Sequence, residues 1–223
     1  SIKKIKTNEA SNDVLLKYLE IKDKKIEKQR YNSFSADLIN RLYYNEMMLQ
    51  VLGADNFKLY LQAPYLYYHK LIAENTQHDK LQLDLCCGNG MHSFTGAKNG
   101  ASVIALDYAE NSIAICKKRE AVLNLNVDFR IADVQILSFQ NEVFDIVTCV
   151  GSLSYLDNNF FFKEVNRVLK KDGMFICLDS FNHNPIYKLN RLIHYFRGNR
   201  SYSTLTRMPD MKTIQLLKEI FAH

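Results

Sequence analysis

LQLDLCCGNG, residues 81–90, is a short apolar run that ends in a turn containing two glycines. The run is too short for a typical helix and is bounded by turn residues, which favours a buried strand. A helical stretch follows it and ends at Gly100, since glycine is the residue that most often terminates a helix. The segment therefore predicts a strand, a turn and a helix, the first unit of a parallel α/β sheet.

The same alternation continues along the chain. Four further apolar runs have the length and composition of strands, and they lie at residues 102–106, 126–132, 144–150 and 174–178. Helical patterns at residues 110–124 and 157–171 separate some of them. Strands that alternate with helices of 10–15 residues predict a doubly wound parallel sheet, an α/β fold with five expected strands in a core spanning residues 80–185.

Helical patterns lie on both sides of this core. We expect residues 1–79 to form a helical cap, with helices from about residue 13, over residues 35–52, and from Pro64 to about residue 74. Residues 186–223 are expected to form a basic tail of two helical stretches. The aromatic stretch at residues 60–68 fits either an acceptor pocket or a dimer contact, and the oligomeric state does not follow from the sequence.

The composition excludes several classes of protein. A chain of 223 residues with 47% hydrophobic and 24% charged residues can bury one core and is not a disordered chain. No run of eighteen apolar residues occurs, and the basic residues 1–6 lack the apolar stretch of a signal peptide. The five cysteines (Cys86, Cys87, Cys116, Cys149 and Cys177) are an odd number, and three of them lie in or at the end of apolar runs, which indicates reduced thiols in a cytoplasmic protein. They form no CxxC pair, so no structural zinc or other metal site is expected.

Charge is unevenly distributed along the chain. Residues 1–30 carry a net charge of +4, residues 31–185 carry −4, and residues 186–223 carry +5. An acidic centre with basic ends suits a cationic ligand in the middle and an anionic partner at the edge. The alternative interpretation is that the lysines and arginines are solvated faces of the terminal helices.

Acidic residues stand at three of the expected strand ends. Asp84, Asp107 and Asp133 should meet at one edge of the sheet, because ligands of open parallel sheets bind at the carboxyl ends of the strands. A dinucleotide site is disfavoured, since Ser93 replaces the third glycine of the GxGxxG fingerprint and Asp84 would repel a pyrophosphate. A cofactor with a cationic amino acid end is favoured, and Asp107 is placed to accept hydrogen bonds from two ribose hydroxyls.

Five segments in order resemble the motifs of the class I S-adenosylmethionine-dependent methyltransferases. They are LDLCCGNG (83–90), IALD (104–107), IADV (131–134), FDIVTC (144–149) and EVNRVLKKDGM (164–174). The resemblance covers roughly residues 31–180 and implies a Rossmann-like fold, S-adenosylmethionine as cofactor and S-adenosylhomocysteine as product. The chain departs from the family at Cys86, where glycine is usual. It also still looks helical at residues 219–223, where such domains continue with an antiparallel strand pair; either the sheet has five strands or more strands follow residue 223.

The resemblance also implies roles for individual residues. The methionine part would be held by Asp84 and the backbone of Cys86 and Gly88, and Gly90 would allow the chain to pass close to it. Val150 would touch the methionine end, and Tyr31 would cover the cofactor. Asp107 would bind the ribose, Tyr108 and Ser112 would flank the adenine, Asp133 would accept from the adenine amino group, and the Val134 N–H would donate to the ring. Alternatively, Asp133 caps the following turn, and Tyr31 and Tyr108 are packing aromatics.

The sulfonium methyl group is already activated, so such a protein mainly aligns the acceptor and excludes water. A hydroxyl acceptor would benefit from a general base, for which the candidates are Tyr155, Asp179 and His183, with His69 and His92 behind them. We name His183 as the base because it lies in a loop and histidine ordinarily titrates near neutral pH, although a lone loop histidine is often structural. The sequence CVGS (149–152) stands where amino-group methylases carry an Asp/Asn-Pro-Pro-aromatic turn, which disfavours methylation of an amino group on a DNA base or an amide.

The basic tail more loosely resembles those of bacterial methyltransferases for surface-polysaccharide sugars, and Arg191, Arg197 and Arg200 suit phosphates on an acceptor. We therefore predict a methyltransferase for a small molecule, a sugar or sugar nucleotide of polysaccharide biosynthesis. One alternative is an RNA methyltransferase, although no RNA-binding motif accompanies the basic ends, so nucleic acid is not the expected partner. The other is a non-catalytic nucleotide-binding scaffold. The presence of both Asp84 and Asp107 argues against it, because a site that had lost its function need not keep these acids.

Overall fold

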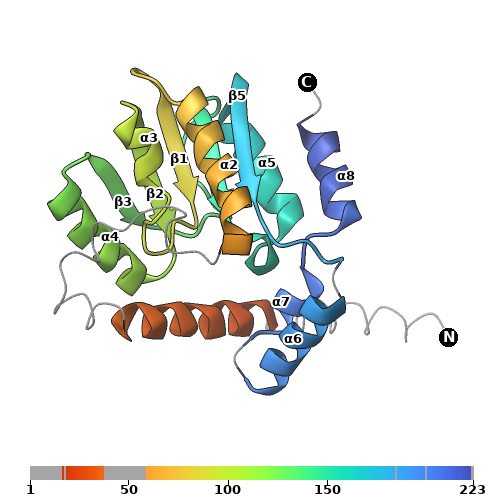
Figure 1. The fold of residues 1–223 in the computed structure, drawn as a ribbon. Helices are drawn as coiled ribbons and strands as arrows, with labels where there is room; N and C mark the ends of the chain where they lie inside the picture. Colours follow the sequence, from red (N-terminus) through yellow and green to blue (C-terminus); the bar gives the residue numbers. More distant parts are fainter. Residues whose placement is uncertain (1–16, 18, 38–58, 184, 199, 222–223) are drawn as a thin grey trace.

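The centre of the computed structural model is a parallel β-sheet (Figure 1). The structure describes residues 17, 19–37, 59–183, 185–198 and 200–221. In this part of the chain, five strands lie in the order β3-β2-β1-β4-β5, with all neighbours parallel. Their bounds are β1 Leu81–Leu85, β2 Ser102–Asp107, β3 Val127–Ile131, β4 Phe144–Val150 and β5 Leu169–Leu178. The predicted doubly wound, Rossmann-like α/β sheet is confirmed, and the strand order reverses between β1 and β4.

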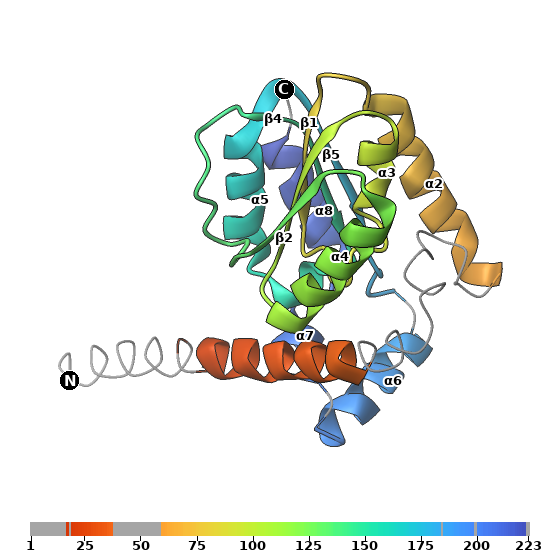
Figure 2. The same cartoon turned by 90° about the vertical axis from the view of Figure 1, so that its left-hand side faces the viewer.

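Helices cover both faces of this sheet (Figure 2). One face carries α2 (Leu59–Asn75), α3 (Phe94–Lys98) and α4 (Glu110–Leu123), and the other carries α5 (Asn158–Val168) and α8 (Met211–Ile220). The short helices η3 (Leu153–Tyr155) and α7 (Ser203–Thr206), together with α6 (Pro185–Phe196), lie at the carboxyl end of the strands. Residues 19–37 form one further helix, here called the cover helix, which lies across that same end.

The core explains why these segments adopt these elements. Leu83 and Leu85 of β1 are fully buried, as expected for a central strand covered on both faces. Phe161, Phe162 and Val165 of α5 fill the space between the sheet and α8. No helix in the described ranges is long and apolar enough to cross a membrane.

Two predicted boundaries were wrong. The third N-terminal helix begins at Leu59 instead of Pro64, so the proline lies in its second turn. Proline there removes one backbone hydrogen bond, but burial of Tyr68 and Ile72 against Ile146 and Ile176 keeps the segment helical. This helix lies within the predicted cap, residues 1–79, and packs directly on the sheet.

The second correction concerns β5. The helix predicted to reach residue 171 ends at Val168, and Leu169 already pairs with Phe144 of β4. An irregularity then accommodates residues 170–173 before Met174 pairs with Ile146. Burial of Leu169 against β4 outweighs the local helical pattern.

The helix predicted over residues 35–52 lies mostly outside the described residues, and the described part belongs to the continuous cover helix. The basic tail contains two main helices as predicted, α6 and α8, with the short α7 between them. All five cysteines are free; Cys87, Cys116 and Cys149 are buried.

Candidate functional site

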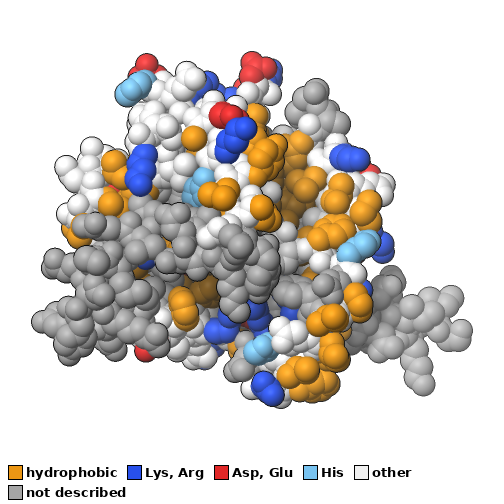
Figure 3. All heavy atoms as spheres, viewed as in Figure 1, with side chains coloured by type: hydrophobic (Ala, Val, Ile, Leu, Met, Phe, Trp, Pro, Cys, Tyr) orange, Lys and Arg blue, Asp and Glu red, His pale blue; other side chains and the backbone are white. Residues whose placement is uncertain are grey.

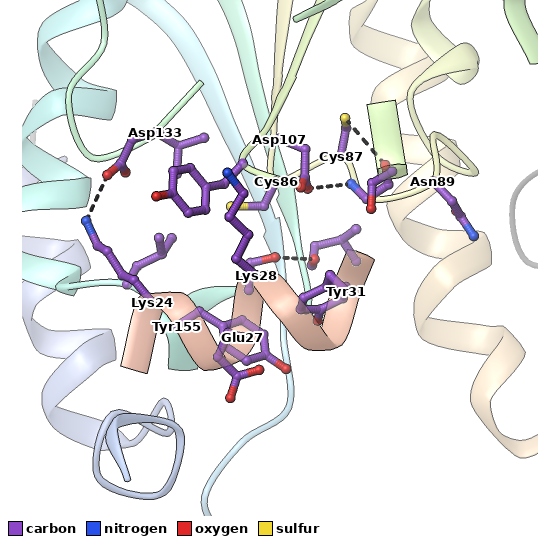
Figure 4. A pocket seen from close by; sticks show the side chains of 18 of the residues that line it. Lys24, Glu27, Lys28, Tyr31, Cys86, Cys87, Asn89, Asp107, Asp133 and Tyr155 are labelled. Atoms are coloured by element: carbon purple, nitrogen blue, oxygen red, sulfur yellow. Dashed lines mark hydrogen bonds and ion pairs between the residues drawn. The ribbon is translucent and has the colours of Figure 1, made fainter. Parts of the chain in front are cut away.

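A pocket of about 300 Å³ opens between the carboxyl end of the sheet and the cover helix (Figure 4). The turns after β1, β2, β3 and β4 form its roof, and residues of the cover helix and of the segment around α7 form its floor. Its lining residues carry five carboxylates (Glu20, Asp23, Glu27, Asp107 and Asp133) and three basic side chains (Lys24, Lys28 and Arg207). This excess of acids favours a ligand with positive charge.

The turn after β1 has an unusual backbone. Cys86, Gly88 and Gly90 have positive φ values of 57°, 55° and 76°. This left-handed region favours glycine, which explains why a glycine is usual at the position of Cys86 in the family that the sequence resembles. A Cβ atom on Gly90 would lie 3.0 Å from the Cys116 sulfur, whereas one on Gly88 would meet no atom within 4 Å. Gly88 thus presents open backbone to the pocket, and Gly90 lets the chain pass close to α4.

Asp107 connects this turn to the end of β2. Its Oδ2 accepts a hydrogen bond from the Gly88 N–H, and its Oδ1 accepts one from the Ala109 N–H, both at 2.8 Å. Burial raises the pKa of Asp107, and these amide donors oppose that rise. The carboxylate lines the pocket while its orientation is fixed by backbone donors, which suits a group that binds ligand hydroxyls.

Asp84 is buried behind the pocket lining and does not line the pocket. Its Oδ2 accepts a hydrogen bond from Ser93 Oγ at 2.6 Å, and its Oδ1 accepts one from Thr148 Oγ1 at 2.8 Å. Burial raises its pKa to about 6, although both hydroxyl donors act in the opposite direction. Asp84 therefore connects β1 to the start of the following helical turn and to β4, and its contact with the methionine part stays a prediction.

At the other end of the pocket, the cover helix contacts the residues expected around an adenine. Lys24 Nζ lies 2.8 Å from Asp133 Oδ2. Lys28 Nζ lies 4.4 Å from the centre of the Tyr108 ring and also pairs with Glu110. Figure 4 shows both lysines reaching from the cover helix towards the sheet. No sequence pattern predicts these contacts, because the partners are about 80–110 residues apart along the chain.

Tyr155 forms the wall beside Val150 and Gly151. Its hydroxyl oxygen accepts a hydrogen bond from Arg30 Nη2 at 2.9 Å and another from Arg200 Nη1. The Tyr31 ring packs edge-on against the Tyr155 ring, with 5.7 Å between centroids. Burial and the neighbouring Tyr155 raise the pKa of Tyr31 above its usual value. The two rings form an aromatic wall, and the guanidinium groups of Arg30 and Arg200 lie near the Tyr155 ring.

Two acids hold the cover helix on the C-terminal segment. Glu27 Oε1 accepts hydrogen bonds from the Ser201 N–H at 3.1 Å and from Ser201 Oγ at 2.9 Å. Asp23 Oδ2 accepts one from the Ser203 N–H at 2.8 Å. These bonds fix the cover helix to the segment that precedes and starts α7, and the contact of Lys24 with Asp133 joins it to the loop after β3.

The histidines are placed differently from the prediction. His183, the predicted base, is exposed, stacks on Phe181 and is not part of the pocket lining. His92 does line the pocket, stacks on Tyr65, and shares a 2.9 Å hydrogen bond with His69. Burial and the neighbouring His69 lower the pKa of His92 to about 4, so its imidazole is neutral near pH 7.

The structure brings most of the predicted site residues to one pocket. Those that line it are Tyr31, Cys86, Gly88, Asp107, Tyr108, Ser112, Asp133, Val134 and Val150. Asp84 and Gly90 lie behind the lining, and the roles of all these residues in binding stay predictions. Of the predicted phosphate-binding arginines, Arg200 reaches Tyr155, Arg191 is buried against Thr204, and Arg197 is exposed and does not line the pocket.

Comparisons with known proteins agree with this geometry. Residues 83–173 match the family described as "Methyltransferase domain". A demethylmenaquinone methyltransferase of Lactococcus lactis is 35% identical over 112 residues, which cover 48% of this chain and 44% of that protein. A demethylmenaquinone methyltransferase of Leptospira interrogans is 29% identical over 213 residues, covering 85% of this chain and 77% of that protein.

Solved structures give the same result. A putative methyltransferase from Bacillus halodurans has a TM-score of 0.56 and 25% identity, covering 70% of this chain and 67% of that one. In the Lactococcus match, the chain spans less than half the length of its curated relative. Residues 83–173 therefore match a methyltransferase domain, and the surrounding fold is the Rossmann-like fold expected for class I S-adenosylmethionine-dependent methyltransferases.

Proposed function

We propose that this protein transfers the methyl group of S-adenosylmethionine to a small-molecule acceptor. The observation that carries the proposal is Asp107, whose carboxylate is oriented by two backbone amides at the edge of the acidic pocket. The volume of about 300 Å³ is within the range of small-ligand pockets, and the excess of acids suits the sulfonium and ammonium groups of the cofactor.

The bound cofactor would supply an activated methyl group. The Asp107 carboxylate would accept hydrogen bonds from the ribose hydroxyls, and the open backbone at Gly88 would approach the methionine part. Asp133 would accept from the adenine amino group, for which it must release or share Lys24. The cover helix would exclude water from the reacting atoms.

The acceptor would lie beside Tyr155, Tyr31 and Gly151, where the cover helix meets the α7 segment. We propose a sugar or sugar nucleotide, because Arg200 and Arg207 stand at this end and suit an anionic group such as a phosphate. A quinone-type acceptor is the second candidate, favoured by the names of the relatives. If the acceptor is a hydroxyl, His92 is a better candidate for the general base than His183, because His92 lines the pocket and His183 does not.

Two measurements test the proposal. Calorimetric titration with S-adenosylmethionine should show micromolar binding, whereas NAD, used as control, should not bind. Purified protein incubated with methyl-labelled cofactor and a panel of nucleotide sugars, lipid-linked sugars and a demethylated quinone should label one class. Binding of NAD in place of S-adenosylmethionine would contradict the proposed identity of the cofactor. Binding of the cofactor with labelling of RNA alone would contradict the small-molecule acceptor.

A further inference from the structure

Helix α6 exposes apolar side chains and buries a charged one. Ile186 and Phe196 are each 77% exposed, and Leu189 is 58% exposed, whereas Arg191 is only 6% exposed. Arg191 Nη1 donates a hydrogen bond to the carbonyl oxygen of Thr204, so the charged residue faces the body of the protein. This is the reverse of the usual surface helix, whose apolar side faces the core.

The exposed apolar residues form a continuous stripe. With 3.6 residues per turn, Ile186, Leu189, Leu192, Ile193 and Phe196 cover about a third of the helix circumference, nearly opposite Arg191. Figure 3 shows hydrophobic side chains gathered over α6 at the lower right of the molecule. Apolar patches of this kind on otherwise polar surfaces mark sites of interaction with a membrane or a partner.

Cationic residues border this stripe. Lys188 lies along one edge of the stripe, Arg197 lies along the opposite edge just after the helix ends, and both side chains are exposed. Residues 186–223 carry a net charge of +5. An apolar stripe flanked by basic residues fits the interface of an anionic bilayer, where the apolar side enters the acyl boundary and the cations meet phosphate headgroups.

The stripe lies close to the acceptor end of the pocket. Helix α7 contacts both α6 and η3, and the pocket is lined by Ser203 of α7 and Tyr155 of η3. Figures 1 and 2 show α6, α7 and the cover helix together at the carboxyl end of the sheet. A bilayer in contact with α6 would therefore face the side of the molecule on which the acceptor end lies.

We propose that α6 binds the protein reversibly to an anionic lipid surface through the stripe Ile186–Phe196. This surface contact is independent of the proposed methyl transfer. If both hold, the acceptor is a molecule presented at a membrane, such as a lipid-linked sugar or a quinone.

Vesicle sedimentation tests the proposal. Purified protein is mixed with vesicles of phosphatidylcholine alone, or with phosphatidylglycerol added in equal amount, at low and high salt. We expect binding to the anionic vesicles, weakened by high salt. The double variant Ile186→Asn/Phe196→Asn should bind at least about tenfold more weakly, because two large apolar side chains no longer enter the interface. The reversal Lys188→Glu/Arg197→Glu should lose the preference for phosphatidylglycerol.

The control is the variant Ile136→Asn/Phe160→Asn, which removes apolar residues of similar exposure, 77% and 66%, outside α6. It should bind vesicles like the unchanged protein. Equal vesicle binding by the α6 variant, or salt-independent binding to phosphatidylcholine alone, would overturn the proposal. So would self-association of the protein in solution that the α6 variant abolishes, without vesicle binding, since the stripe would then join two copies. Cofactor titration without vesicles checks the fold of each variant and tests the proposed function separately.

Discussion

Lys24 Nζ lies 2.8 Å from Asp133 Oδ2, which joins the cover helix to the loop after β3 across 109 residues of sequence. Both side chains are about one-third exposed, so the pair is partly screened by solvent. Its position matters more than its strength, because it closes the end of the pocket where the adenine amino group is expected. The cover helix therefore acts as one wall of the candidate cofactor site.

Replacing Lys24 should loosen this wall with little effect on global stability. We expect Lys24→Met to lower the free energy of unfolding by less than about 1 kcal/mol, the scale of partly exposed ion pairs. Hydrogen exchange of residues 19–37 should become faster. Lys70→Met is the control, because the exposed side chain of Lys70 pairs with Glu74 at 3.6 Å on α2, away from the cover helix. Equal exchange of the cover helix in both variants would contradict the assigned contact.

Glu27 should matter far more than Lys24. It is 8% exposed and accepts hydrogen bonds from Arg30 and from both the N–H and hydroxyl of Ser201. Glu27→Ala leaves these donors without their acceptor, so we expect a loss of about 2–4 kcal/mol in the free energy of unfolding by urea.

The matched control for Glu27→Ala is Glu20→Ala on the same helix. Glu20 is 37% exposed and lies 3.8 Å from Arg207, which predicts a loss below about 1 kcal/mol. If both variants lost the same stability, the cover helix would not depend on the buried contact with Ser201.

Asp107 is the residue on which cofactor binding should depend most. In Asp107→Asn the side-chain amide must face one of the two backbone donors, Gly88 N–H or Ala109 N–H, and the charge that would hold the ribose hydroxyls is lost. We expect calorimetry to show S-adenosylmethionine binding weakened by about 1–3 kcal/mol, roughly 5- to 150-fold. The control is Asp128→Asn, whose side chain on β3 is half exposed and which should bind like the unchanged protein. An unchanged affinity in Asp107→Asn would contradict the role assigned to Asp107.

The raised pKa of Asp84 predicts a pH effect on stability. Because its pKa is about 6 in the folded protein and near 4 when unfolded, the folded state binds the proton more tightly. The contribution of Asp84 to stability therefore falls as pH rises from about 4 to 6. Between pH 5 and 7, Asp84→Asn should gain about 1–2 kcal/mol relative to the unchanged protein, measured by urea unfolding at each pH.

His92 should show the opposite sign. Its pKa is lowered to about 4, so its contribution to stability is present above pH of about 6.5 and is lost as pH falls towards 4. His92→Gln should therefore gain relative stability as pH decreases over the same range. Parallel pH trends in Asp84→Asn and His92→Gln would contradict the environments described for these two groups.

The sequence determined the sheet and placed the candidate binding residues at its edge. Buried strands need apolar runs, so β1, β2 and β4 could be read directly, and the carboxyl end of each strand located Asp107 and Asp133. The turn containing Gly88 was also predictable, because residue 88 has a positive φ, a conformation that glycine adopts more readily than other residues. These features depend on neighbouring residues and on the common direction of parallel strands.

The tertiary structure decided what covers that site. The contacts of Lys24 with Asp133 and of Glu27 with Ser201 join residues more than 100 positions apart, and no local pattern encodes such pairs. The same holds for the early start of β5 at Leu169, for Pro64 inside α2, and for the side of α6 that faces solvent. For β5 and α2, burial against a distant strand outweighs local preference, because the free energy of packing depends on which surfaces meet in three dimensions.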